Sequence, residues 1–143
     1  MGCVLGVDLG LKRTGLAVSD ALHIGATPLP YLTPKSRAED IDFILAICMQ
    51  RDVSDIVIGY PIMPKSEEEG MMAKRARKFS EVLQETCQER NLSIRVHLLD
   101  ERYSSKSAQL RLIEKGIKKK NRKNSLDSEV ACMLVEEYLS YIK

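Results

Sequence analysis

Residues 6–20 read GVDLGLKRTGLAVSD and place an acidic residue, Asp8, inside an otherwise apolar segment. Residues 3–9 and 14–19 favour strands and residues 10–13 favour a turn, so the stretch predicts an antiparallel hairpin. Aspartate is depleted in strands, and a buried carboxylate without a partner costs several kcal/mol. Asp8 therefore requires a compensating cation or a set of hydrogen-bond donors.

Length and composition limit the class of protein. A chain of 143 residues, 44% hydrophobic and 29% charged, has the size and composition of one globular domain, and we expect residues 1–143 to form one. The apolar runs are far shorter than the ~20 residues of a membrane span and no secretory signal is visible, so we expect a cytoplasmic protein without a membrane partner. The cysteines are far apart in sequence and are expected to be reduced and buried: Cys3, Cys48, Cys87 and Cys132.

Hydrophobic periodicity predicts an α/β protein with a mixed five-stranded sheet flanked by helices. A three-strand antiparallel meander joins two parallel strands through right-handed crossovers. Pro28 and Pro30 suit an edge position for the third strand. Ser36 and Glu39 form a capping box, and Ser125 is the expected cap of the last helix. The expected strands are 3–9, 14–19, 24–32, 55–60 and 94–99, and the expected helices are 36–51, 71–90, 104 or 105 to 116, and 125–142.

Three acidic residues are expected to converge. Asp8 lies near the end of the first strand, Glu101 follows the fifth, and Asp127 falls in the first turn of the last helix. Ligand sites in open α/β sheets lie beyond the carboxyl ends of parallel strands, so these residues should meet at one edge. Three close carboxylates repel one another, and the oxygen-only donor set favours Mg²⁺ or Mn²⁺ as the counter-ion.

Each acidic residue also has an ordinary structural interpretation. Asp8 suits hydrogen bonds to backbone N–H groups of the following turn. Asp127 suits a favourable charge at a helix N-terminus. Glu101 suits a surface ion pair with Arg102 or Lys106. Their joint occurrence is what favours a metal site.

Five segments together resemble the YqgF/RuvX family, in the family's order and over almost the whole chain. The resemblance implies an RNase H-like fold related to the RuvC Holliday-junction resolvases. It also implies activity as a resolvase or as a nuclease that matures the 5′ end of 16S ribosomal RNA. It assigns metal-binding catalytic roles to Asp8, Glu101 and Asp127, with Asp100 a weaker candidate. The segments are GVDLGLKRTGLAVSD (6–20), IVIGYP (56–61), AKRARKFSEVL (73–83), LLDERYSS (98–105) and NSLDSEVACMLVEEYL (124–139).

One departure from the pattern concerns the fourth strand. RuvC-type resolvases carry a glutamate at its end, where this chain has Gly59. If the resemblance holds, the second acidic ligand must come from Glu101. A non-catalytic nucleic-acid-binding module, in which Gly59 records the loss of metal chemistry, is therefore one alternative function.

The resemblance implies hydrolysis of phosphodiester bonds by a two-metal mechanism. Lysine and arginine side chains would hold the phosphate backbone. Aromatic residues are few, with five tyrosines and two phenylalanines, so we expect recognition of backbone shape without base stacking. His23 and His97 are expected to be structural. The expected substrate-binding residues are Lys12, Arg13, Arg102, Lys118, Lys119 and Lys120.

The leading expectation is a metal-dependent nuclease of structured RNA, acting in 5′-end maturation of precursor 16S ribosomal RNA. The alternative substrate is branched DNA, as for a Holliday junction resolvase in recombination and repair. A homodimer would suit a junction with two scissile strands. The first hairpin also resembles the phosphate-holding hairpin of sugar kinases and actin-like ATPases, but such proteins need a second domain, which 143 residues cannot house.

Overall fold

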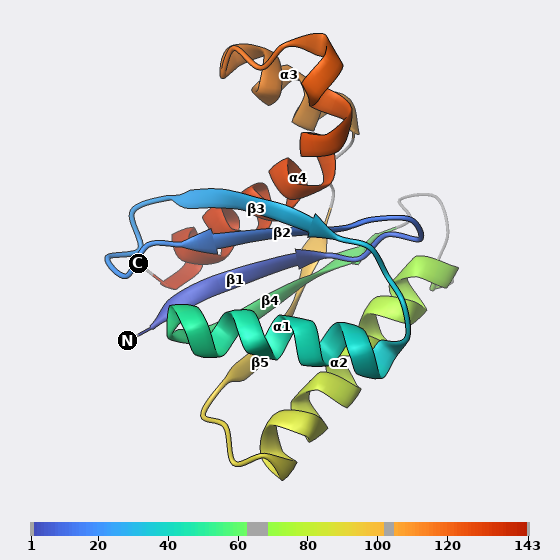
Figure 1. Ribbon diagram of the computed structural model, residues 1–143, viewed down its shortest axis with the longest axis vertical. Helices are drawn as coiled ribbons and strands as arrows, with labels where there is room; N and C mark the ends of the chain where they lie inside the picture. Colours follow the sequence, from blue (N-terminus) through green and yellow to red (C-terminus); the bar gives the residue numbers. More distant parts are fainter. Residues whose placement is uncertain (1, 63–68, 102–104, 143) are drawn as a thin grey trace.

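The computed structural model describes residues 2–62, 69–101 and 105–142, and it describes residues 105 and 119–125 by their backbone alone. Five strands and four helices are present in this part of the chain (Figure 1). The strands are β1 (Cys3–Asp8), β2 (Thr14–Ser19), β3 (Ala26–Leu32), β4 (Val53–Pro61) and β5 (Arg95–Glu101). The helices are α1 (Arg37–Arg51), α2 (Met71–Glu89), α3 (Ser105–Glu114) and α4 (Lys119–Ile142).

The strands form one mixed sheet in the order β3-β2-β1-β4-β5. β2 pairs antiparallel with β1 and β3, and β4 pairs parallel with β1 and β5. This arrangement confirms the predicted meander joined to two parallel strands. The proline-containing strand β3 lies at an edge, where a missing backbone donor costs least.

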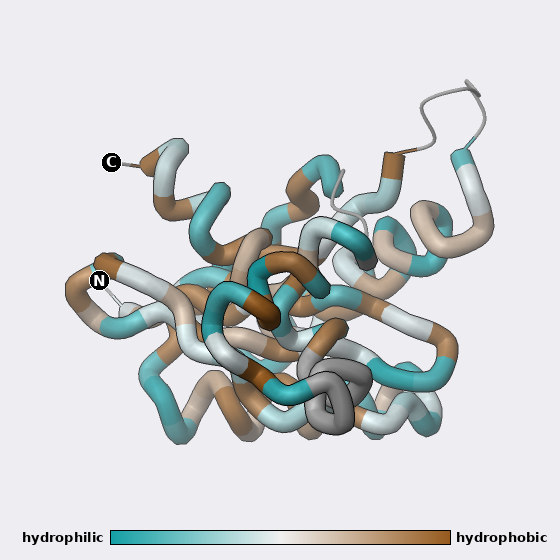
Figure 2. Tube along the Cα trace, turned by 90° about the horizontal axis from the view of Figure 1, so that it is seen from above, coloured by the Kyte–Doolittle hydropathy of each residue, from teal (hydrophilic) through white to brown (hydrophobic). Residues whose placement is uncertain are grey.

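Helices cover both faces of the sheet (Figure 1). α1 and α2 pack on the face that carries Val7 and Ile58, whereas α4 packs on the face that carries Val4 and Val57. The core lies in two clusters, one on each face of the sheet. Figure 2 shows hydrophobic and hydrophilic residues interspersed along the trace. Because side chains alternate along a strand, Asp8 lies on the same face as Val4 and therefore faces the α4 layer.

Helix α3 packs on α4 and stands away from the sheet in Figure 1. Glu129 of α4 is 1% exposed, and its two carboxylate oxygens are each 2.8 Å from a cation of α3 or its C-terminal end, Arg111 Nε and Lys115 Nζ. A buried carboxylate is tolerable when it is paired in this way. The ion pairs thus hold α3 on α4.

The predicted start of the last helix was wrong. α4 begins at Lys119 instead of after a Ser125 cap, so the lysine- and arginine-rich residues 119–123 form its first turns. Lysine and arginine have good helix propensity, which lets the helix extend through this run. Asp127 consequently lies in the third turn, and the helix N-terminus does not explain its presence. Glu101 is the last residue of β5 and does not follow the strand.

Two expectations from composition can be compared with the structure. All four cysteines are free thiols, and three are buried, while Cys3 is partly exposed. In the described ranges, no helix is long and apolar enough to cross a membrane.

Candidate active site

Asp8 and Glu101 meet on the α4 side of the sheet. They are the last residues of β1 and β5, which lie on either side of β4. Gly59 of β4 leaves room between them, because a Cβ atom at this position would lie 2.6 Å from Glu101 Oε2. The Glu101 carboxylate therefore extends over Gly59, and it is hydrogen-bonded to the Asp8 side chain.

Asp127 reaches the same region from α4. Gly15 of β2 is the register partner of Asp8, and a Cβ atom at Gly15 would collide with the carbonyl oxygen of Asp127. A glycine at this position thus allows α4 to lie directly against β2. The close approach puts Asp127 near enough for its charge to raise the pKa of Asp8.

The pKa values of all three carboxyl groups are raised. Burial, followed by the charges of Glu101 and Asp127, raises the pKa of Asp8 well above its usual range. Burial raises the pKa of Glu101 to about 7, against the opposing effect of the hydrogen bond with Asp8. Burial also raises the pKa of Asp127, although the Arg13 guanidinium acts to lower it. Perturbed carboxyl groups gathered in this way are typical of functional sites.

The donor set fits a divalent cation in its chemistry. All three groups offer carboxylate oxygens, which Mg²⁺ and Mn²⁺ prefer. Within the described ranges, no group of three or more His, Cys, Asp or Glu side chains is placed to hold a metal ion. Asp8 and Glu101 are the contacting pair, whereas Asp127 Oδ2 faces Arg13 Nε at 3.4 Å.

Two of the predicted phosphate-binding cations lie in the turn after β1. Arg13 pairs with Asp127, and its guanidinium carbon lies 5.6 Å from the centroid of the Tyr31 ring. Lys12 is exposed in the same turn. The structure therefore brings Arg13 to the Asp127 carboxylate, and it leaves Lys12 exposed to solvent in the same turn.

Two residues at the site were missed by the sequence reasoning. Arg75 of α2 donates a 2.7 Å hydrogen bond from Nη1 to the carbonyl oxygen of Gly10, which fixes the β1–β2 turn. Tyr31 of β3 lies against Arg13. Arg75 falls inside a segment that carries the family resemblance, but no spacing rule relates it to a turn 65 residues away.

The other predicted residues are farther away or outside the description. Arg102 lies outside the described residues, as do the side chains of Lys119 and Lys120. Lys118 is exposed and precedes α4, about 13 Å along the helix axis from Asp127 at 1.5 Å per residue. Asp100 is exposed, and strand alternation directs it to the opposite face from Glu101.

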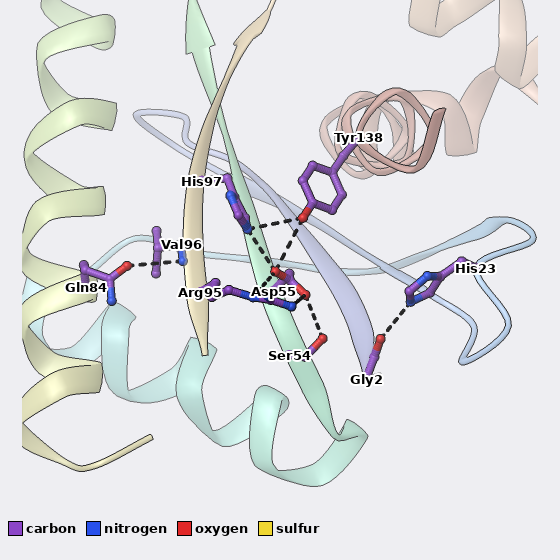
Figure 3. A network of polar contacts seen from close by, with 9 residues as sticks. All are labelled: Gly2, His23, Ser54, Asp55, Gln84, Arg95, Val96, His97 and Tyr138. Atoms are coloured by element: carbon purple, nitrogen blue, oxygen red, sulfur yellow. Dashed lines mark hydrogen bonds and ion pairs between the residues drawn. The ribbon is translucent and has the colours of Figure 1, made fainter. Parts of the chain in front are cut away.

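Both histidines make structural hydrogen bonds. His23 Nε2 is 2.8 Å from the carbonyl oxygen of Gly2. His97 Nε2 lies 2.9 Å from Asp55 Oδ1, near the start of β4, in a network with Tyr138 (Figure 3). Burial acts to raise the pKa of Asp55, but hydrogen bonds from its neighbours, His97 foremost, hold it below the usual range.

Sequence comparison matches this chain to a family model and to named relatives over almost its whole length. A family model named RuvX and described as Holliday junction resolvase matches residues 2–141. A protein of Maridesulfovibrio salexigens named "Putative pre-16S rRNA nuclease" is 36% identical over 137 residues, which cover 96% of this chain and 97% of the relative. A relative of the same name from Endomicrobium trichonymphae is also 36% identical, over 140 residues that cover 97% of this chain and 96% of the relative.

Solved structures show the same fold at low sequence identity. The Thermus thermophilus RuvC complex with a Holliday junction substrate aligns with a TM-score of 0.60 and 14% identity, over 99% of this chain and 96% of that one. The fowlpox virus Holliday junction resolvase aligns with a TM-score of 0.58 and 11% identity, over 97% and 99% of the two chains. The fold is thus that of the RuvC-like, RNase H-like resolvases. Because the family model and relatives above 30% identity both span nearly the whole chain, this protein belongs to the RuvX family of Holliday junction resolvase-like nucleases.

Proposed function

We propose that this chain is a metal-dependent nuclease whose catalytic and metal-binding residues are Asp8, Glu101 and Asp127. We propose further that it acts in the 5′-end maturation of precursor 16S ribosomal RNA. The observation that carries the first proposal is the hydrogen-bonded pair of Asp8 and Glu101 at the carboxyl edge of parallel strands. The names of its relatives support the second proposal.

The residues of the site have separable roles in this proposal. Two divalent ions, when bound, would supply the positive charge that lowers the pKa of the attacking water and stabilises the leaving 3′ oxygen. Asp8 and Glu101 hold their carboxylates together from two different strands, so little conformational entropy is lost on binding a cation. Asp127 adds a third carboxylate from α4. Arg13 pairs with Asp127 in the free protein. When substrate binds, Arg13 would instead donate a charge-assisted hydrogen bond to a phosphate oxygen.

Substrate binding is proposed to depend on cations around the carboxylates. Lys12 and Arg13 would contact phosphates next to the scissile bond, because they lie in the turn after Asp8. The basic start of α4 would contact a more distant part of the backbone. The proposed set remains Lys12, Arg13, Arg102, Lys118, Lys119 and Lys120. We also propose that residues 1–143 act as one cytoplasmic domain, with a homodimer as the form that would suit a symmetric substrate.

The test is a digest of two substrates with purified protein. Precursor 16S ribosomal RNA and a synthetic four-way DNA junction are incubated with Mg²⁺, Mn²⁺ or EDTA, and the cut ends are mapped. We expect RNA cleavage near the mature 5′ end, with 5′-phosphate products, which EDTA abolishes. Asp8→Asn should remove the activity, whereas Asp100→Asn, on the opposite sheet face, should keep it. Equal cleavage by wild type and Asp8→Asn would refute the assignment of the site.

Cleavage of the junction is the second candidate function. The description of the family model and the fold shared with RuvC favour it. Symmetric cuts in the junction, with the RNA left intact, would select this function over RNA maturation. Binding of either nucleic acid without cleavage under both metals would instead indicate a non-catalytic module.

A further inference from the structure

A pocket of about 410 Å³ lies between the end of β3 and the first turns of α1. Its volume falls within the roughly 300–1,000 Å³ of small-molecule sites. Tyr31 of β3 and Phe43 of α1 both line it, as do the charged residues Lys35, Glu39 and Asp40. Nothing in the proposed reaction uses this pocket.

Both aromatic side chains are partly exposed to solvent, Phe43 on α1 and Tyr31 on β3. Phe43 is 47% exposed, although its neighbours Ile41 and Ile44 on α1 are buried in the core. Tyr31 is 36% exposed. Single exposed apolar residues need no explanation, but Tyr31 and Phe43 line the same pocket, and an exposed aromatic side chain is a surface on which a flat ligand can stack.

The pocket is connected to the candidate active site through one side chain. Tyr31 lies against the Arg13 guanidinium at 5.6 Å, and Arg13 Nε lies 3.4 Å from Asp127 Oδ2. A strand whose phosphate contacts Arg13 would therefore present its neighbouring nucleotide to Tyr31.

The charge of the lining favours a neutral ligand over an anion. Glu39 and Asp40 together outweigh Lys35, so a phosphate group in the pocket would be repelled. Asp40 is buried, and its Oδ1 accepts a 3.0 Å hydrogen bond from the backbone N–H of Lys35, which fixes this wall before any ligand binds. An uncharged aromatic ring that carries N–H donors meets both conditions.

We propose that this pocket binds an unpaired nucleobase of the substrate strand, next to the phosphate at the active site. The inference rests on the proposed nuclease function and adds a base-binding site to it. Stacking on aromatic side chains is the usual way in which proteins hold unpaired bases. The few aromatic residues of the chain thus supply one stacking site, which the sequence analysis did not expect.

The test compares two strands that differ in their bases alone. A fluorescent oligoadenylate and an abasic ribose-phosphate strand of equal length are titrated in EDTA, so that cleavage plays no part. Wild type should bind the oligoadenylate about five- to a hundredfold more tightly. Phe43→Ser should lose this preference and keep its affinity for the abasic strand. Met49→Ser, which removes another exposed apolar side chain of α1, is the matched control and should keep the preference.

A second measurement does not depend on any variant. A strand with 4-thiouridine is cross-linked to wild-type protein by light, and the modified peptides are mapped by mass spectrometry. Cross-links within residues 29–45 support the proposal, and cross-links confined to other segments overturn it. Equal affinity for the two strands also overturns it, even if the protein cleaves RNA. Loss of the preference in Phe43→Ser, in a protein that cleaves nothing, would instead refute the nuclease function and leave the base pocket standing.

Discussion

Replacing Gly59 with alanine tests whether the space above β4 positions the Glu101 carboxylate. The added Cβ atom would lie 2.6 Å from Glu101 Oε2 and 3.0 Å from Leu134 Cδ1. To reach an ordinary 3.4 Å contact, the Glu101 oxygen must retreat by about 0.8 Å. The atom that moves is the end of a flexible side chain, so the fold should accommodate the change at little cost in stability.

The displacement should have a large effect on catalysis. A misplacement of about 1 Å at a catalytic group can cost roughly 10²-fold in rate, so we expect Gly59→Ala to lower kcat about 10- to 100-fold. The assay measures cleavage of precursor 16S ribosomal RNA across a titration of Mn²⁺, alongside thermal unfolding. We expect the melting temperature to change by no more than a few degrees.

Gly25→Ala is the matched control, because a Cβ atom there meets no other atom within 4 Å. This variant should retain the wild-type kcat. A Gly59→Ala protein that also keeps the wild-type kcat and metal dependence would show that the position of the Glu101 carboxylate does not limit the reaction. The proposed role of Glu101 would then fail.

Three further predictions concern charge and stability. The pKa of Glu101 is raised from 4.5 to about 7, so the folded metal-free protein binds this proton more tightly than the unfolded chain does. The stability that this proton contributes is complete below pH 4.5 and is lost as the pH rises to about 7. The free energy of unfolding should fall by about 3 kcal/mol over this range in wild type and by much less in Glu101→Gln, as measured by denaturant unfolding. Asp8→Asn should abolish cleavage and yet raise the melting temperature of the metal-free protein at pH 8, because its amide can donate to Glu101; Mn²⁺ should stabilise wild type but not this variant. His97→Ala should lower the free energy of unfolding by about 1–3 kcal/mol, since Asp55 loses a hydrogen bond, with no change in kcat.

Much of the fold could be predicted because its signals are local. The apolar segment of β1, the turn after it and the prolines of β3 predict the hairpin and the edge strand. The pair Ser36 and Glu39 marks the start of α1, where the Ser36 side chain accepts a hydrogen bond from the Glu39 backbone. The start of α4 was mispredicted because a serine resembles a helix cap wherever it occurs. The lysines and arginine before Ser125 have good helix propensity, so the local sequence does not decide between a helix that begins at Lys119 and one that begins after Ser125.

The contact between Asp8 and Glu101 could be anticipated, since the parallel strands β1, β4 and β5 end at one edge of the sheet. The partners of those residues could not. Arg13 faces Asp127 because Gly15 lets α4 pack closely against β2. The Arg13–Asp127 ion pair therefore depends on the packing of two segments that are far apart in sequence. The aromatic pocket likewise needs Tyr31 and Phe43 from different elements, and neither residue carries a motif.

β4 carries Gly59 where RuvC-type resolvases have a glutamate, and the position of Gly59 bears on whether this difference means a loss of metal-dependent catalysis. Glu101 pairs in register with Pro61, two residues beyond Gly59, and its carboxylate extends back over Gly59 toward Asp8. A side chain at position 59 would occupy the space that this carboxylate fills, so a glutamate on β4 and the observed placement of Glu101 exclude each other. The glycine is therefore what the site requires if the acidic group comes from β5. Gly59 was the main sequence feature in favour of a non-catalytic module. In the structure it instead favours a site whose second carboxylate, that of Glu101, comes from the neighbouring strand β5.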